Sequence, residues 1–104
     1  MKDITPLFDH IQKIIDILNI IKNKIDDDTN VIWTEYDTPQ ALINKLDLEI
    51  NNLQSRNYKT ISNINGLFIP TGTLQEVSIS NGWGDEFLTL AEQFDHHYEK
   101  VAGR

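Results

Sequence analysis

Apolar residues recur every three or four positions along the first quarter of the chain. This spacing predicts an amphipathic helix from about Thr5 to Ile25, because residues three and four apart lie on one face of a helix. Thr5 is expected to cap the helix, and Pro6 suits its first turn because an amide there would have no helical partner. The apolar face consists of Leu7, Ile11, Ile14, Leu18, Ile21 and Ile25, and it is widened by Ile4, Phe8 and Ile15. A face this broad predicts contacts with at least two other helices.

Two groups of apolar residues lie outside that face. Ile17 and Ile20 are predicted to be exposed, where they would form an apolar patch or a surface for self-association as a homodimer. Val31, Ile32 and Trp33 form a short apolar run after the helix. We expect this run to be extended and to pack against the edge of the other helices.

Three later stretches repeat the helical spacing. Thr38 followed by Pro39 predicts the start of a second helix, which should fade near residues 55–57. A weaker third helix is expected to follow it, and the last helix is expected from about Trp83 to Val101. The residues predicted to face inward are Leu42, Ile43, Leu46, Ile50 and Leu53, then Tyr58, Ile61, Ile64 and Phe68, and finally Trp83, Phe87, Leu90, Ala91, Phe94, Tyr98 and Val101.

Residues 66–80 are compatible with two structures. Thr73 and Glu76 have the spacing of a capping box, which predicts a short helix that ends at Gly82. The alternation of polar and apolar residues from Glu76 onward would instead suit a hairpin with the apolar run 67–69. The helix is favoured because an isolated two-stranded hairpin is only marginally stable in water.

These elements together predict an all-α protein. We expect a compact antiparallel helical bundle of three main helices plus one or two short helices. A chain of 104 residues has the size of one domain, so residues 1–104 are expected to form a single helical domain.

The charge balance restricts the possible partners. The sequence has 16 acidic and 9 basic residues, which gives a net charge of −7. Binding to nucleic acid or to an anionic membrane depends on basic side chains, so neither partner is expected. The chain has no cysteine, which excludes disulfides, thiolate metal ligands and a cysteine nucleophile. It has no start typical of a signal peptide and no apolar run of membrane-spanning length, so we expect a cytoplasmic protein.

An acidic stretch after the first helix resembles a calcium-binding loop in part of its spacing. Asp26, Asp28, Asn30 and Asp37 fall on positions 1, 3, 5 and 12 of that pattern. The pattern needs a glycine at position 6, where this chain has Val31, a β-branched residue that resists positive φ. The stretch is therefore predicted to be a solvated connector that binds no calcium.

Other candidate chemistry is weak. His96 and His97 are adjacent, but successive helical residues point about 100° apart, so we expect no shared metal ion. No nucleophile pattern is present, and His10 has no partner in the sequence that would orient it. The glycines before Asp85 and Glu86 do not predict a phosphate site, because these carboxylates already occupy the positive end of the helix. No catalytic residue, metal or cofactor is predicted.

The function expected from these observations is that of a small acidic binding protein without enzymatic activity. It would be of the inhibitor or immunity type and would recognise a macromolecular partner with a basic surface. The alternatives are a small enzyme or ligand-binding protein with its site in the turns from Pro70 to Gly84, where Glu76, Asp85 and Trp83 could converge, or a self-associating structural protein. The candidate binding residues are Asp26, Asp27, Asp28, Glu35, Asp37, Trp83, Glu76 and Asp85.

Overall fold

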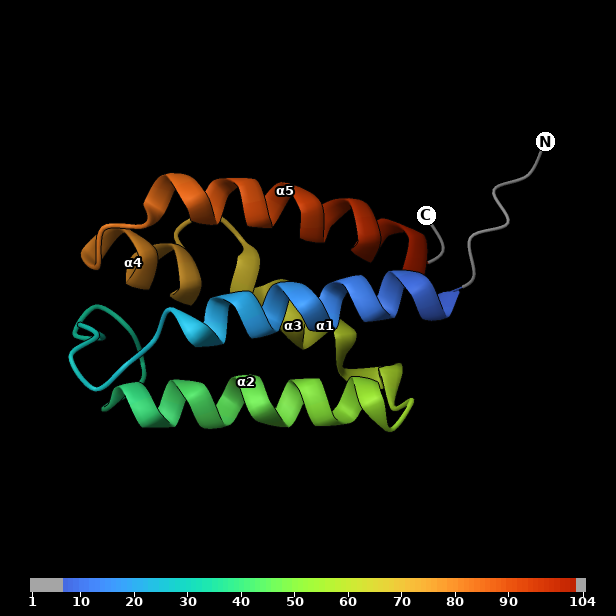
Figure 1. Ribbon diagram of the computed structural model, residues 1–104, viewed down its shortest axis with the longest axis horizontal. Coiled ribbons are helices and arrows are strands. Elements are labelled where there is room, and N and C mark those ends of the chain that lie inside the picture. The colour runs from blue at the N-terminus through green and yellow to red at the C-terminus, as the bar shows by residue number, and fades with distance from the viewer. Residues whose placement is uncertain (1–6, 103–104) are drawn as a thin grey trace.

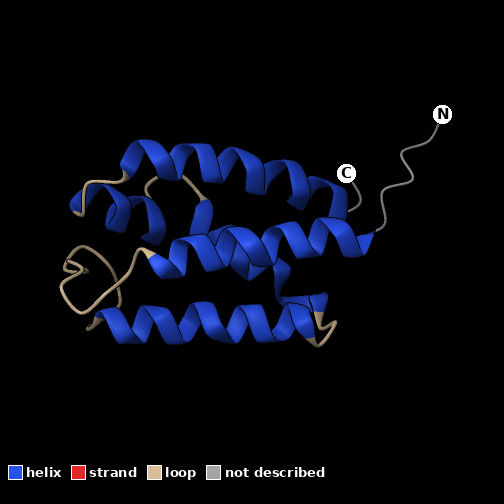
Figure 2. Cartoon of the chain, viewed as in Figure 1, coloured by secondary structure: helices blue, strands red, loops and turns tan. Residues whose placement is uncertain are grey.

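The computed structural model describes residues 7–102. Its elements are α1 (Leu7–Asn23), α2 (Pro39–Gln54), the 3-10 helix η1 (Tyr58–Thr60), α3 (Ile61–Phe68), α4 (Thr73–Ser80) and α5 (Gly84–Val101). Figure 2 shows that this described part of the chain contains helices and loops but no strand. The prediction of an all-α bundle with three main helices and short additional ones is confirmed.

The first helix is the centre of the bundle. α1 lies between α5 and α2, and it runs antiparallel to both of them (Figure 1). The short helices α3 and α4 pack against α5, and α3 also contacts α2. Within the described residues α2 and α5 do not contact each other, so α1 joins the two long helices, as its broad apolar face predicted.

The burial of α1 differs from the prediction in three residues. Ile17 is only 4% exposed, although it was predicted to be exposed. Because α2 and α5 cover α1 from opposite sides, its buried surface extends beyond the predicted face, and Ile17 is not available for self-association. Leu7 and Phe8 are 46% and 60% exposed, because the first turn of α1 extends past the ends of α2 and α5 (Figure 1). Ile20 is exposed as predicted. The predicted roles of Ile4, Thr5 and Pro6 lie outside the described residues.

The start and the inner face of α2 agree with the sequence. The Ala41 amide donates a hydrogen bond to the Thr38 hydroxyl oxygen at 3.1 Å, and Pro39 is the first helical residue. The buried residues of α2 include Leu42, Leu46, Ile50 and Leu53. Glu49 is also buried, with a side chain only 1% exposed. It lies three residues after Leu46 and four before Leu53, so helical spacing places it on the inner face, but a pattern read from apolar residues alone omits it.

The segment 73–80 is a helix, and the alternative hairpin is wrong. The predicted capping box is also wrong, because Gly72 occupies the capping position and Thr73 is the first residue of α4. The Thr73 hydroxyl is therefore not used by the helix and donates a hydrogen bond to Glu35 Oε1 at 2.6 Å. This contact ties the start of α4 to the connector between α1 and α2.

The other end of α4 follows the prediction of a glycine terminator. Gly82 has a φ of +85°, in the left-handed region that glycine adopts without steric cost. The Trp83 amide donates to the Ser78 carbonyl at 2.9 Å, which is the long hydrogen bond of a Schellman motif. Trp83 then precedes α5, whose predicted aromatic face is buried at Phe87 and Phe94.

Candidate functional site

The connector, residues 24–38, is fixed to the bundle by one asparagine of the α4 end. The Asn30 amide donates to Asn81 Oδ1 at 2.8 Å, and Asn81 Nδ2 donates to the Asn30 carbonyl at 2.9 Å. Thr29 and Val31, on either side of Asn30, are buried. The connector is thus a defined surface rather than a loose loop.

The three successive aspartates lie on the outside of the connector, as predicted. Asp26, Asp27 and Asp28 are all exposed. The Asp28 amide donates to Asp26 Oδ1 at 2.9 Å, and the Asp26 amide donates to the Thr29 hydroxyl oxygen at 2.9 Å. These local bonds fix the backbone of the turn and leave the carboxylates of Asp27 and Asp28 directed to solvent. Across residues 7–102, no group of three or more histidine or acidic side chains is arranged to hold a metal ion.

The apolar run of the connector is mostly exposed, which corrects the prediction that it packs against the helices. Val31 is buried, but Ile32 and Trp33 are each 73% exposed. The reason is a tight turn, in which the Thr34 amide and hydroxyl both donate to the Val31 carbonyl, at 3.0 and 2.8 Å. This turn lets Val31 enter the core and directs the next two side chains outward.

Trp33 borders a depression of about 330 Å³, which we call the Trp33 depression. Its wall is formed by the connector, by the turn between α3 and α4, and by the first turn of α4. The side chains that line it include Trp33, Glu35, Ile69, Thr73 and Glu76. The sequence analysis assigned these two glutamates to different predicted sites, Glu35 to the acidic connector and Glu76 to the alternative site in the turns. The structure brings these two carboxylates to one place.

The other two residues of the alternative site lie elsewhere. Trp83 and Asp85 line a separate depression that Glu76 does not reach. Trp83 is partly buried against the core, and its ring lies at 71° to the Phe87 ring with a centroid distance of 6.4 Å. Lys24 covers the indole at 5.7 Å from its centroid. This packing gives Trp83 the role of a structural anchor at the start of α5.

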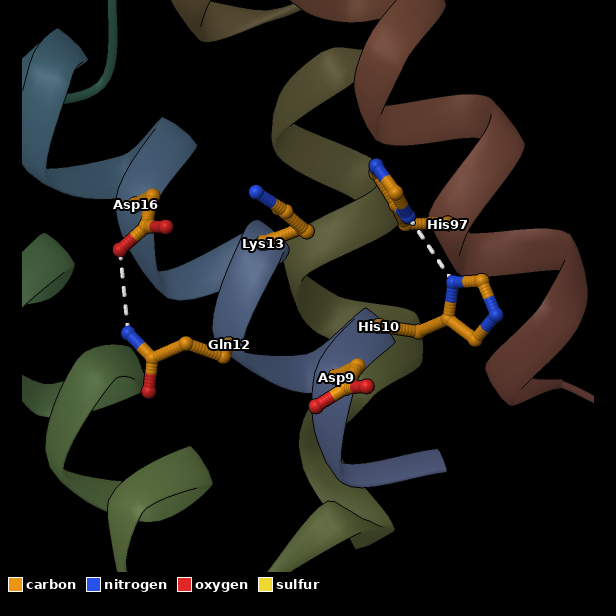
Figure 3. A pocket seen from close by; sticks show the side chains of 6 residues that line it. All are labelled: Asp9, His10, Gln12, Lys13, Asp16 and His97. Carbon is orange, nitrogen blue, oxygen red and sulfur yellow. Dashed lines mark hydrogen bonds between the residues drawn. The ribbon is translucent and has the colours of Figure 1, made fainter. Parts of the chain in front are cut away.

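A third group of polar residues joins the start of α1 to the end of α5. His10 and His97 face each other, with their Nδ1 atoms 3.0 Å apart (Figure 3). They border a depression of about 440 Å³ that Asp9, Lys13 and Asp16 also line. Both members of this pair lie at helical spacing from residues predicted to face inward, since His10 precedes Ile14 by four residues and His97 precedes Val101 by four. Their contact had no local signal, because the two residues are 87 positions apart in the sequence.

His10 and His97 are joined by one hydrogen bond between their Nδ1 atoms. One Nδ1 must donate and the other must accept, so the contact is lost when both rings are protonated. Burial is the largest cause that lowers the pKa of His97 below its ordinary value of 6.5. Smaller effects in the same direction come from the basic side chains of His96, His10 and Lys13.

We expect the free energy of unfolding to fall as the pH is lowered from 7.5 to 5.5. Folded His97 takes up a proton less readily than His97 in the unfolded chain, so its contribution is complete above pH 6.5 and is lost as the pH falls through the lowered pKa. Urea denaturation at a series of pH values measures this dependence. His97→Gln should reduce the slope between these pH values by more than the exposed His96→Gln, because His96 contributes only a smaller part of the lowering. Equal slopes for wild type and His97→Gln would contradict the assignment.

The exposed connector with the Trp33 depression and the histidine pair are two separate polar sites. Only the first combines an exposed aromatic side chain with charges of one sign.

Among residues 7–102, no helix is both long enough and apolar enough to cross a membrane. The chain matches no model of a protein family, no curated protein and no solved structure.

Proposed function

We propose that this protein is a small acidic binding protein without enzymatic activity, which recognises a macromolecular partner with a basic surface. The observation that carries the proposal is the exposure of Ile32 and Trp33, at 73% each, among the carboxylates of the connector. Tryptophan is enriched among the residues that dominate protein–protein binding, where it is buried by the partner and surrounded by polar contacts. The connector presents this combination on a backbone that is already ordered by hydrogen bonds.

The charge of the connector determines which partner would fit. Residues 26–37 contain five carboxylates, those of Asp26, Asp27, Asp28, Glu35 and Asp37, and no basic residue. We call these five residues, together with Ile32 and Trp33, the connector face. A surface of one sign attracts a partner of the opposite sign and raises the rate of encounter. An inhibitor or immunity-type protein in the cytoplasm would use such a face to bind a basic target.

The proposal is tested by association kinetics. Wild-type protein and variants are used to isolate a partner from native extract, and the association and dissociation rates of that partner are then measured at low and physiological salt. Replacement of Asp26, Asp27 and Asp28 by asparagine should lower the association rate, because these charges attract the partner. It should also flatten the salt dependence of that rate, which arises because the Debye screening length falls from about 30 Å at 0.01 M salt to about 8 Å at 0.15 M. Trp33→Ala should mainly raise the dissociation rate.

A matched control removes the same amount of charge elsewhere. Asp9→Asn, Asp16→Asn and Glu99→Gln together remove three negative charges from exposed positions on α1 and α5. This control should retain most of the wild-type association rate and its salt dependence. A partner that binds the aspartate variant and the control equally fast, at both salt concentrations, would contradict the proposal.

A further inference from the structure

We propose that the Trp33 depression receives one arginine side chain of the partner, with its guanidinium group stacked on the Trp33 indole and bound by Glu35 and Glu76. The inference rests on the proposed function, because it names the chemical group that the partner inserts. It is more specific than the charge of the connector face, since it assigns a cation to one depression.

The shape of the depression suits a single long side chain. Its volume of about 330 Å³ is close to the lower limit of the range of about 300–1,000 Å³ that is typical of ligand pockets. Its wall at Gly72 is tightly packed, because a Cβ atom at this residue would lie 2.8 Å from the Ile69 carbonyl oxygen. The Gly72 amide donates to the same oxygen at 2.9 Å. The turn that forms this wall is therefore held by its own backbone contacts.

The two carboxylates of the depression lack a basic partner, and that of Glu35 is held in position. The Thr73 hydroxyl donates a hydrogen bond to Glu35 Oε1 at 2.6 Å, which fixes the direction of that carboxylate. The residues that line the depression include no lysine, arginine or histidine. Within the described part of the chain, neither Glu35 nor Glu76 takes part in an ion pair.

The three ion pairs of the described residues show where the nearby basic side chains are used. Lys22 binds Asp47, Lys24 binds Glu86 and Lys45 binds Glu49, at 2.7, 2.6 and 2.9 Å. The cation that would balance Glu35 and Glu76 is thus not supplied by these lysines. A partner with a basic surface can supply it.

Arginine fits this combination better than lysine does. The guanidinium group is planar, so it can stack on the face of an indole while its edge donates hydrogen bonds to carboxylates. The ammonium group of lysine is a compact and strongly hydrated point charge, and its removal from water costs more. An apolar side chain would contact Trp33 and Ile69 but would leave both carboxylates without a partner.

The test uses a small probe and does not need the natural partner. The ¹⁵N-labelled protein is titrated with arginine blocked at both ends as its N-acetyl and N-methylamide derivative, and the indole N–H signals are followed by NMR. The chain has two tryptophans, so Trp83 serves as an internal reference. We expect a saturable shift of the Trp33 signal with a Kd on the order of 1 mM, as weak single-group binding implies, and little shift of the Trp83 signal.

Two matched probes separate the sources of binding. Blocked citrulline has nearly the same shape as arginine without the charge, and it should shift the Trp33 signal little at the same concentrations. Blocked lysine should bind at least about threefold more weakly than arginine. A Trp33 signal that does not respond to arginine, or that responds equally to citrulline or lysine, would overturn the inference.

Variants locate the site and separate this inference from the proposed function. Glu76→Gln and Glu35→Gln should each weaken the arginine probe at least about fivefold. Asp27→Asn, on the connector face but not in the lining, should change its Kd less than about twofold. Equal effects of Glu76→Gln and Asp27→Asn would show only diffuse attraction and overturn the inference, even if the partner still depends on Asp26, Asp27 and Asp28. Probe binding that is lost in Glu76→Gln would support the inference even if those aspartates prove irrelevant to the partner.

Discussion

Replacement of Phe94 by alanine is expected to lower the free energy of unfolding by about 3–5 kcal/mol. Phe94 has an exposure of 0%, and its ring is stacked on the Phe68 ring with a centroid distance of 4.1 Å. It also stacks on Tyr98 at 5.5 Å. The substitution would leave a cavity at the contact between α5 and α3. Urea denaturation followed by circular dichroism measures the loss.

Leu88 provides the control for Phe94. It lies on the same helix, but its side chain is 53% exposed, so Leu88→Ala should cost less than about 1 kcal/mol. The comparison separates the loss of buried packing from any general effect of an alanine in α5. Equal denaturation midpoints for the two variants would show that the face of α5 assigned to the core is wrong.

Lys45→Met is expected to lower the free energy of unfolding by about 3 kcal/mol, because it leaves a buried carboxylate without its cation. The Glu49 side chain is 1% exposed, and its Oε2 lies 2.9 Å from Lys45 Nζ. Asn52 Nδ2 also donates a hydrogen bond to Glu49 Oε1 at 3.3 Å, and this contact would remain in the variant. Methionine keeps most of the length of the lysine side chain, so the loss reports on charge more than on packing. Chemical denaturation again provides the measurement.

Two further variants identify the cause of that loss. The double variant Lys45→Met, Glu49→Leu removes both charges and should recover most of the lost stability, since an apolar pair can replace a buried ion pair at little cost. Lys22→Met breaks the Lys22–Asp47 pair, whose side chains are 31% and 45% exposed, and it should cost less than about 1 kcal/mol. A double variant that is no more stable than Lys45→Met would show that the charge of Glu49 is not the cause.

The sequence predicted the elements of this fold better than it predicted which side chains are covered. Spacing alone located the long helices, because the period of a helix is a local property of the chain. It failed for Ile17, because the burial of that residue depends on two helices that approach α1 from opposite sides. Glu49 was missed for another reason: its spacing from Leu46 and Leu53 places it on the inner face of α2, but the face was defined by apolar residues alone. Its ion pair with Lys45 compensates the burial of the charge.

The candidate site was predicted only in part. The acidic residues of the connector followed from composition, and their exposure followed from their charge. The exposure of Trp33 did not, because it depends on a turn in which Thr34 bonds to the Val31 carbonyl and reverses the direction of the chain. The meeting of Glu35 with Glu76 and of His10 with His97 depends on contacts between distant segments, which no local pattern in a single sequence encodes.

The central position of α1 has a consequence for the order of folding during synthesis. α1 and α2 are neighbours in sequence, so they can pair as soon as α2 has left the ribosome. The side of α1 that contacts α5 must wait for residues 84–101, because α5 is the last helix of the described chain. At a synthesis rate of about 5–20 residues per second, the delay between the completion of α2 and that of α5 is about 2–10 s. During that interval the nascent chain exposes the side of α1 that α5 later covers.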